Sequence, residues 1–464
     1  MLFSSMTFIF VFLPLVLLAY YLCSTRRGKN GVLLVASLLF YGWGEPRYLL
    51  VMLLSMILTW GAGMLIARGK RKLLWLTLTI LLDLGILIYF KYTNFLLENI
   101  SAVFNHELDP IHVVMPIGIS FYTFQAISYL VDVYRGDVQV QRNLYKVMLY
   151  ISLFPQLVAG PIVKYHDVCE QIDGRKENLS NFALGLRRFI VGLSKKMLIA
   201  NTMGAVADKV FTLPVEQVDP LVSWIGAIAY AFQIYYDFSG YSDMAIGLCL
   251  MFGFRLPENF NYPYISASIT EFWRRWHISL STWFKEYLYI PLGGNRVNKS
   301  RNYFNLFVVF LATGVWHGAS WNFIFWGLWH GIFIIIEKLT GWHKLEKGFG
   351  VKVLRHAATL LIVLVGWVFF RAETFSDACR YVGNMFGAFS HVESQTPVSY
   401  YLDRHAMLVM LAAIVLSMPV ARQMIHIKRL LPALAVDVWL LVLFLCSWAT
   451  MAASTYNPFI YFRF

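Results

Sequence analysis

Charged residues are scarce in this sequence. Asp, Glu, Lys and Arg make up 14% of its 464 residues, whereas 58% are hydrophobic and 17% are aromatic. This balance excludes an ordinary soluble protein. The longest polar stretches, 165–181 and 371–405, are too short to bury a core of their own. We therefore predict a single membrane domain that covers residues 1–464.

Cysteine is also rare, and the familiar catalytic motifs are missing. The five cysteines are scattered without paired spacing, which excludes a disulfide framework and a cysteine-based metal cluster. The histidines form no H-x-x-x-H or H-E-x-x-H pattern, so no metal site is predicted. The lack of a G-x-S-x-G elbow and of a Walker glycine loop argues against a serine hydrolase and a nucleotide-driven pump.

Long apolar runs take the place of these features. They recur from Thr7 to Ala452, and several are shorter than the roughly 20 residues that a straight transmembrane helix needs. Some helices must then be tilted, broken or re-entrant. We predict an all-α polytopic membrane protein with roughly ten or eleven transmembrane helices. The first run should remain as a span, because its basic residues follow it rather than precede it as in a secretory signal.

Basic residues set the expected orientation in the membrane. The net charge is +13, and basic clusters follow the first apolar run at 26–29 and the third at 68–72, with others at 285–301 and 422–429. Because positively charged loops stay on the cytoplasmic side, the N-terminus should lie outside, as should the less basic loop 371–405. Topology thus explains the charge. The lipid bilayer is the expected partner, and nucleic acid is not.

Two histidines interrupt one apolar run. In GVWHGASWNFIFWGLWHG, residues 314–331, His317 and His330 have bulky apolar neighbours. A desolvated imidazole must find a partner, face a wet cavity or serve in chemistry. If it is kept neutral, it can take a proton from a hydroxyl that attacks an acyl carbonyl, and Trp316 can wall such a pocket. On one continuous helix the two rings would point to different sides and could not share a metal ion. The local sequence does not rank them, and a structural role stays open for each.

Two other segments place charge beside apolar residues. ITEFWRRWHISLSTWFKEYLYIPLGGNR, residues 269–296, is either an amphipathic interfacial helix or a segment whose polar face lines a cavity, with His277 pointing inward. In 184–200, basic pairs alternate with apolar residues. This pattern suits a helix along the inner interface as well as one that enters the membrane.

Carboxylates occur at membrane depth in QIYYDFSGYSDMAIG, residues 233–247. Asp237 and Asp243 lie there between apolar runs, where ionisable groups usually pair or face a wet interior. We expect Arg274 and Arg275 as their partners. The pairs are either structural or form a scaffold that orients a catalytic histidine. Further polar side chains assigned to this cavity are Ser239 and Asn322.

Three of these stretches together resemble the membrane-bound O-acyltransferase family, specifically its bacterial alginate O-acetyltransferase branch. They are 233–247, NFNYPYISASITEFWRRWHISLSTWFKEYLYIPLGGNR and 314–331. The stretches MLFSSMTFIFVFLPLVLLAYY, MPIGISFYTFQAISYLVDVYRG and LFPQLVAGPI and the end PFIYFRF are similar to that branch as well. The resemblance implies many spans and re-entrant or interfacial helices around a central cavity. It also implies a catalytic core at about 110–340, with peripheral helices at 1–100 and 350–464.

The resemblance also implies roles for the histidines. The histidine at the floor of the family's cavity matches His317 in GVWHG, which would accept the proton of the attacking hydroxyl. The family's second polar position matches His277 in FWRRWH, which would orient a reactant or the developing oxyanion. His330 falls outside both positions and is carried as a secondary candidate.

The implied reaction is acyl transfer in a bacterial plasma membrane. A cytoplasmic thioester, acetyl-CoA or another acyl thioester, free or on a carrier protein, would be a co-substrate rather than a permanently bound cofactor. The acceptor would be an extracytoplasmic polysaccharide, with a secreted or membrane-anchored SGNH-type esterase or acetyltransferase as the expected partner. Three alternatives stay open: D-alanyl transfer to a wall polymer, transport or flipping of a lipid-linked sugar, and a catalytically silent scaffold.

Overall fold

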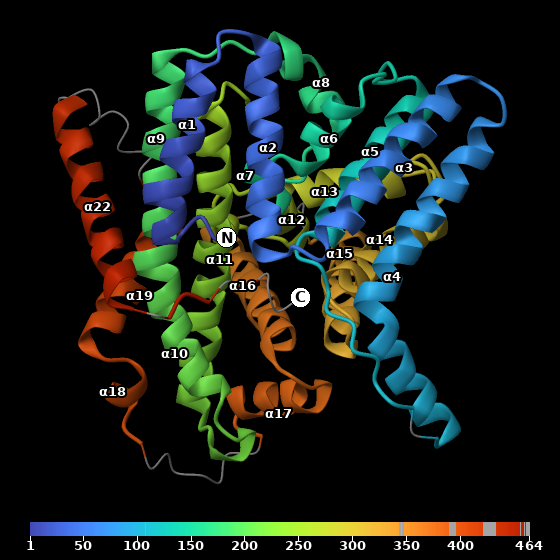
Figure 1. The fold of residues 1–464 in the computed structure, drawn as a ribbon. Helices are drawn as coiled ribbons and strands as arrows, with labels where there is room; N and C mark the ends of the chain where they lie inside the picture. Colours follow the sequence, from blue (N-terminus) through green and yellow to red (C-terminus); the bar gives the residue numbers. More distant parts are fainter. Residues whose placement is uncertain are drawn as a thin grey trace. The chain divides into compact units, whose positions relative to one another are not determined.

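The computed structural model describes residues 1–106, 108–342, 345, 348–388, 396–420, 433–454, 456–458 and 460. Every regular element in these residues is a helix, and this part of the chain contains no strand (Figure 1). The predicted all-α class is therefore confirmed. The basic cluster at 422–429 lies outside the described residues.

Six helices in the described chain are long and apolar enough to cross a membrane. They are Leu49–Ala67, Lys72–Phe104, Leu179–Phe211, Trp321–Thr340, Phe349–Arg371 and Leu434–Ala453. Two more helices, α2 (Arg26–Gly44) and α14 (Lys299–His317), are as long as α3 (Leu49–Ala67), with 19 residues each. Both begin with basic residues. The chain is a multi-pass membrane protein. A total of roughly ten or eleven spans stays a prediction.

The chain groups into two compact units. The first contains Met1–Phe189 and Tyr241–Pro257, and the second contains Ile190–Gly240 and Glu258–Phe464. Helices of the first unit, besides α2 and α3, are α1 (Leu13–Leu22), α4 (Lys72–Phe104), α5 (Ile119–Arg135), α6 (Leu144–Ser152), α7 (Phe154–Leu157) and α8 (Tyr165–Gly174). Both units draw on α9 (Leu179–Ser194) and α11 (Pro220–Met251).

The second unit holds most of the predicted site residues. Its helices, besides α14, are η2 (Lys195–Ala200), α10 (Asn201–Phe211), α12 (Ile269–Arg275), α13 (Ile278–Phe284), α15 (Trp321–Thr340), α16 (Phe349–Arg371), α17 (Phe375–Met385), α18 (Val398–Tyr401), α19 (Arg404–Leu416) and α22 (Ala433–Ala453). The predicted catalytic core at about 110–340 stays a prediction.

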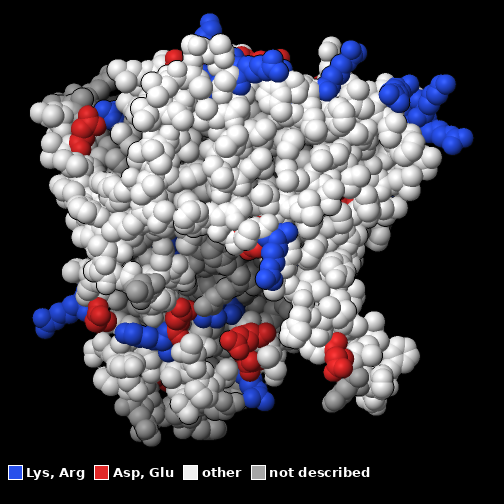
Figure 2. Space-filling view, in the orientation of Figure 1, with Lys and Arg blue, Asp and Glu red and all other residues white. Residues whose placement is uncertain are grey.

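Apolar side chains cover the outer faces of several helices. On α22, Leu434 is 73% and Trp439 61% exposed, and on α4 Leu73 is 63% exposed. Figure 2 shows wide surfaces without charged side chains. Such surfaces are unfavourable in water, whereas hydrocarbon accepts them because each helix satisfies its own backbone groups.

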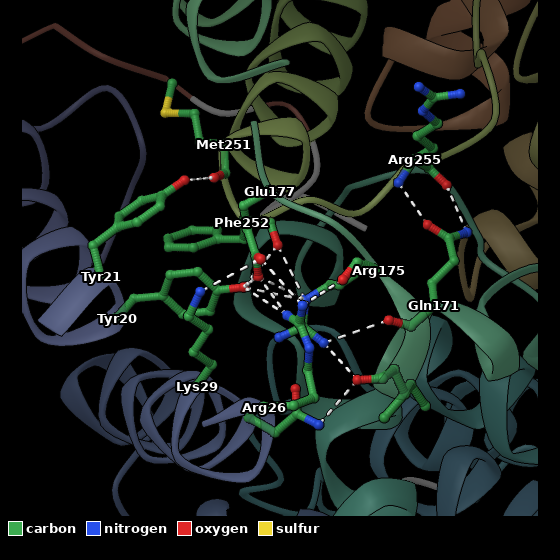
Figure 3. A network of polar contacts seen from close by, with 12 residues as sticks. Tyr20, Tyr21, Arg26, Lys29, Gln171, Arg175, Glu177, Met251, Phe252 and Arg255 are labelled. Atoms are coloured by element: carbon green, nitrogen blue, oxygen red, sulfur yellow. Dashed lines mark hydrogen bonds and ion pairs between the residues drawn. The ribbon is translucent and has the colours of Figure 1, made fainter. Parts of the chain in front are cut away.

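A polar network joins the end of α1 and the start of α2 to the chain before α9 in the first unit (Figure 3). Arg26 and Lys29 both pair with Glu177, which lies just before α9, and the Lys29 Nζ is 3.4 Å from the carboxylate. Arg175 Nε donates to the hydroxyl of Tyr20 at 3.2 Å. Burial raises the pKa of Glu177, but hydrogen bonds from Arg26 and Tyr20 outweigh it and bring this pKa to about 2. Ion pairs therefore join the start of α2 to the chain before α9.

The helices α14 and α15 of the second unit pack with their backbones in contact. A Cβ on Gly314 would overlap the carbonyl oxygen of Phe323, and one on Gly327 would lie 2.8 Å from the Gly314 nitrogen. Only glycine permits such an approach. Because the helix ends at His317 and a new one begins at Trp321, the chain does not form one continuous helix through 314–331.

Candidate active site

His317 occupies the end of α14, where the helix pair places it among aromatic rings. Only 4% of its surface is exposed. The ring centroids of Trp316 and Trp326 lie 4.8 Å from that of His317, and Phe370 lies at 5.3 Å. The glycine contacts of α14 and α15 fix the backbone from which this side chain extends. His317 therefore has little freedom to change position.

A small cavity lies against His317. Its volume is about 10 Å³, which holds about one water molecule. The lining residues are Ile234, Phe238, Trp276, His317, Trp326, Trp367, Phe370 and Ile460. Five of these are aromatic rings of Phe or Trp, so a polar reactant that enters meets His317 as the one ionisable side chain among the lining residues. This arrangement fits the predicted proton acceptor.

His277 is the second buried imidazole. It lies in the break between α12 and α13 with a left-handed backbone (φ 43°) and is fully buried. Its ring meets that of Phe238, which lines the cavity, at a centroid distance of 4.6 Å. The segment 269–296 is thus bent inward at His277. Of the two interpretations of this segment, the structure favours the one in which His277 points into the protein.

Hydrogen bonds assign the proton on His277. The backbone N–H of Ser279 donates to Oδ1 of Asn259 at 3.2 Å, and His277 Nδ1 lies 3.1 Å from the same oxygen. Because an oxygen only accepts, Nδ1 must carry the proton, and the lone pair lies on Nε2. Burial lowers the pKa of His277 to about 3, so the ring is neutral at neutral pH. Its Nε2 is buried and accepts no hydrogen bond within the described chain, which leaves it ready to accept one from a reactant.

Two tryptophans connect the three candidate histidines. Trp316 lies between His277 (6.1 Å) and His317 (4.8 Å), and Trp326 lies between His317 (4.8 Å) and His330 (5.2 Å), all as centroid distances. The structure thus brings together three histidines, from α14, from α15 and from the break between α12 and α13. The spacing of these histidines in the sequence does not predict that they lie close together.

His330 is packed between helices. It is fully buried on α15, its ring is parallel to that of Phe272 at 6.1 Å, and it is not among the residues that line the cavity. Neither ring nitrogen makes a hydrogen bond within the described residues. A Cβ on Gly366 would lie 3.0 Å from its Nε2, so helix α16 closes over it. The surroundings are those of a packed core residue.

Asp237 pairs with a lysine rather than with the expected arginines. Its carboxylate lies 2.7 Å from Lys196 Nζ, and both side chains are buried. It also accepts the backbone N–H of Ile460 at 2.9 Å. The predicted pairing of Asp237 with Arg274 and Arg275 is wrong, because Lys196, which extends from helix η2, forms the ion pair instead.

The other predicted side chains are distributed over different parts of the fold. Asp243 falls in the first unit, where Arg188 binds it at 2.9 Å. Arg275 pairs with Glu271 at 2.9 Å, and both arginines of α12 line a separate cleft. Asn322 donates to the carbonyl oxygen of Ala372 at 2.7 Å, which ties α15 to the end of α16. Ser239 is buried on α11.

Within the described residues, no group of three or more His, Cys, Asp or Glu side chains could hold a metal ion.

Three features of the site could not be predicted from the sequence: Asn259, Lys196 and the rings supplied by α16. Asn259 begins a stretch that carries the family resemblance, but its contact with His277 spans 18 positions and has no local signature. Lys196 belongs to a basic pair in 184–200, where an interfacial position explained the charge equally well.

The whole chain is similar to known acyl-transfer proteins. A profile of the membrane-bound O-acyltransferase family matches residues 139–343. A probable alginate O-acetylase AlgI of Azotobacter vinelandii is 40% identical, with 100% of both chains covered. That of Pseudomonas syringae pv. tomato is 47% identical over 83% of this chain and 75% of its own length. A peptidoglycan O-acetyltransferase of Helicobacter pylori is 37% identical over 83% of this chain and 80% of its own.

Proposed function

This chain belongs to the membrane-bound O-acyltransferase family and is an O-acyltransferase, and we propose that it moves an acetyl group from a cytoplasmic thioester to an extracytoplasmic polysaccharide. The hydroxyl that receives the acetyl group belongs either to the polysaccharide or to a partner protein that completes the transfer. The names of the similar proteins support acetyl as the group and a polysaccharide as the acceptor. The observation that carries the proposal is the placement of His317 against a cavity whose wall also touches His277.

The chemistry follows from the two imidazoles. His317 takes the proton of the attacking hydroxyl while its oxygen bonds to the thioester carbonyl carbon. The tetrahedral intermediate then expels the thiolate, which takes the proton back from His317 and leaves as a thiol. No net proton is gained or lost. General-base catalysis of this kind typically contributes about 10² to 10⁴ in rate.

His277 orients a reactant in this scheme. With its proton on Nδ1 and held by Asn259, its Nε2 accepts a hydrogen bond and cannot donate one to an oxyanion. Of the two roles expected for His277, orientation of a hydroxyl or thiol is therefore the one that its tautomer supports. An oxyanion would need other donors.

Donor, partner and orientation complete the proposal. The donor is acetyl-CoA or another acyl thioester, and the partner is a secreted or membrane-anchored SGNH-type esterase or acetyltransferase. The chain lies in a bacterial plasma membrane with its N-terminus outside, a topology that the basic residues after α1 support. D-alanyl transfer and sugar transport are the alternatives that the experiment must distinguish.

The test follows labelled acetyl from acetyl-CoA into glycan in membrane vesicles, comparing wild type with His317→Ala, His277→Ala and His330→Ala at equal abundance. We expect His317→Ala to lose about 10² to 10⁴ in rate, and His330→Ala to keep most of its activity if it folds. Label that is undiminished in His317→Ala would overturn the assignment of the base. A wild type that incorporates D-alanine and no acetyl would overturn the acyl group.

A further inference from the structure

A buried carboxyl group in the first unit has no counter-ion among the described residues. Asp83 on α4 is 2% exposed, and its Oδ2 makes no hydrogen bond within the described chain. Its Oδ1 accepts one hydrogen bond, from the hydroxyl of Ser55 on α3 at 3.4 Å. This distance is long for a hydrogen bond between two oxygens. The proposed acyl transfer does not use Asp83.

Asp83 lies deep in an apolar helix. It is the one ionisable residue of α4 between Lys72 and Tyr89. Lys72 belongs to the basic cluster that the positive-inside rule assigns to the cytoplasmic face. Asp83 follows it by 11 positions, which is about 16 Å along the helix axis and roughly half the thickness of the hydrocarbon core. An ionised carboxylate at this depth is costly and usually pairs with a cation.

The helices around Asp83 supply hydroxyl groups rather than cations. Both α3 and α5 pack against α4 (Figure 1), and the sequence of α3 contains no titratable residue. On α5, Tyr122 is 1% exposed and lies within electrostatic range of Asp83 and of Tyr41 on α2. The hydroxyl groups of Tyr122 and Tyr41 are buried and make no hydrogen bond within the described residues. Three buried polar groups from three helices thus lie together in the first unit without satisfying one another.

The cations of these helices do not neutralise Asp83. Lys91, the next cation of α4, is 8 positions farther along, which is about 12 Å along the helix axis. The basic first turn of α2 pairs with Glu177, and Arg135 ends α5 in an exposed position. Within the described chain, burial and the hydrogen bond from Ser55 are the two influences on the ionisation of Asp83. A proton is therefore the group that can make this carboxyl neutral.

We propose that Asp83 is a proton-binding site, at which the carboxyl group holds a proton at membrane depth and joins α4 to its neighbours as a neutral group. A protonated carboxyl group carries its own donor, and the hydroxyl oxygens of Ser55 and Tyr122 are acceptors on the neighbouring helices. The bound proton removes the cost of a buried charge. At high pH its loss places a charge between α3, α4 and α5. Because the folded chain then binds a proton that the unfolded chain releases, stability falls as the pH rises.

A hydrophobic carbodiimide is the probe for this site. The protonated carboxyl group adds to one C=N bond of dicyclohexylcarbodiimide, with its oxygen bonding to carbon and its proton passing to nitrogen, so the reaction reports the protonated form. Full-length protein in neutral-lipid nanodiscs would be treated between about pH 6 and pH 10, and mass spectrometry of its peptides would quantify the adduct. We expect Asp83 to be labelled at neutral pH, with labelling that falls about tenfold per pH unit once the group ionises. Glu98, an exposed carboxylate of the same helix, is the internal control and should carry little adduct.

Two buried aspartates provide a matched comparison of variants. Asp83→Asn replaces a neutral carboxyl group with a neutral amide of the same shape, so it should melt like wild type at neutral pH. It should also lose the part of the pH dependence that Asp83 causes. Asp237→Asn removes the partner of the buried Lys196 and should melt well below wild type.

Three results would overturn the site. The first is the absence both of an adduct on Asp83 and of a protonated-carboxyl band in the infrared difference spectrum between wild type and Asp83→Asn. The second is protection of Asp83 from the carbodiimide by sodium ions at constant pH, which would assign a metal cation instead of a proton. The third is a loss of stability in Asp83→Asn as large as that in Asp237→Asn, which would show an ionised Asp83. Labelling of wild type remains decisive if Asp83→Asn misfolds, and none of these measurements depends on acetyl transfer.

Discussion

Lys196 Nζ lies 2.7 Å from the carboxylate of Asp237, and both side chains are almost fully buried. The same two residues hold the C-terminal chain: Asp237 accepts the N–H of Ile460 at 2.9 Å, and Lys196 donates to the carbonyl oxygen of Pro458. Ile460 in turn lines the cavity at His317. One ion pair therefore anchors a distant part of the sequence as a wall of the candidate active site.

Removing one charge of this pair should cost both stability and activity. Asp237→Asn leaves the Lys196 ammonium buried without its counter-ion, and we expect the free energy of unfolding to fall by about 3 to 5 kcal/mol. Displacement of the cavity wall should lower acetyl transfer by up to about 10²-fold. Thermal unfolding in detergent and labelled transfer measure the two effects. The double variant Lys196→Met, Asp237→Leu should recover stability but not activity, since the backbone of the C-terminal segment loses both anchors. A double variant as active as wild type would refute the anchoring role.

Asn259 should affect catalysis through His277, although its Oδ1 also accepts the backbone N–H of Ser279. Asn259→Ala removes the oxygen that holds the Nδ1 proton, so the ring can rotate or change tautomer. We expect kcat to fall by about 10 to 10²-fold with KM little changed, because a reactant is misoriented rather than lost. The matched control is Ser281→Ala, which removes a hydrogen bond to Trp273 on the neighbouring turn. If both variants lose the same small amount of activity, the tautomer has no role.

The stability of the protein should depend on pH through His277. Burial lowers the pKa of this group from 6.5 to about 3 in the folded state. Between these values the unfolded chain binds a proton that the folded chain does not, so the free energy of unfolding falls as pH falls. From pH 6.5 to pH 5 this amounts to about 2 kcal/mol. Melting curves of wild type and His277→Gln at several pH values give the difference between their free energies of unfolding. This difference should change with pH below pH 6.5 and should stay constant above pH 7. Parallel curves across the whole range would contradict a neutral, buried His277.

The fold class could be predicted from the sequence for physical reasons. A chain with so few charges must satisfy its backbone within hydrocarbon, and helices do so without any partner strand. The neighbours of His317 do not distinguish it from His330, since both histidines lie between Trp and Gly residues, and only the family resemblance favours His317. The sequence does not decide whether 184–200 enters the membrane, because its basic pairs suit either position. The structure includes it in the apolar helix Leu179–Phe211.

The parts that escaped prediction depend on where the chain bends. Asn259 contacts His277 from 18 positions earlier in the sequence, and the backbone at that histidine is left-handed. The partner of Asp237 was misassigned because Arg274 and Arg275 are on a short helix that faces a different cleft. Neither the backbone conformation at His277 nor the direction in which the arginines of the short helix face can be inferred from composition or spacing. Polar contacts between distant segments are thus what the sequence conceals most.

The close packing of α14 and α15 gives a last prediction. A methyl group at Gly314 would overlap the Phe323 carbonyl oxygen, so Gly314→Ala must push the helices apart at the turn before His317. We expect a loss of about 1 to 3 kcal/mol in the free energy of unfolding. Acetyl transfer should fall by up to about 10²-fold, since the base moves with its helix. Gly350→Ala on α16, where a Cβ meets nothing within 4 Å, is the matched control. It should keep both the stability and the acetyl transfer of wild type. If Gly314→Ala folds, melts and transfers acetyl like Gly350→Ala, then the contact between the two helices does not position His317.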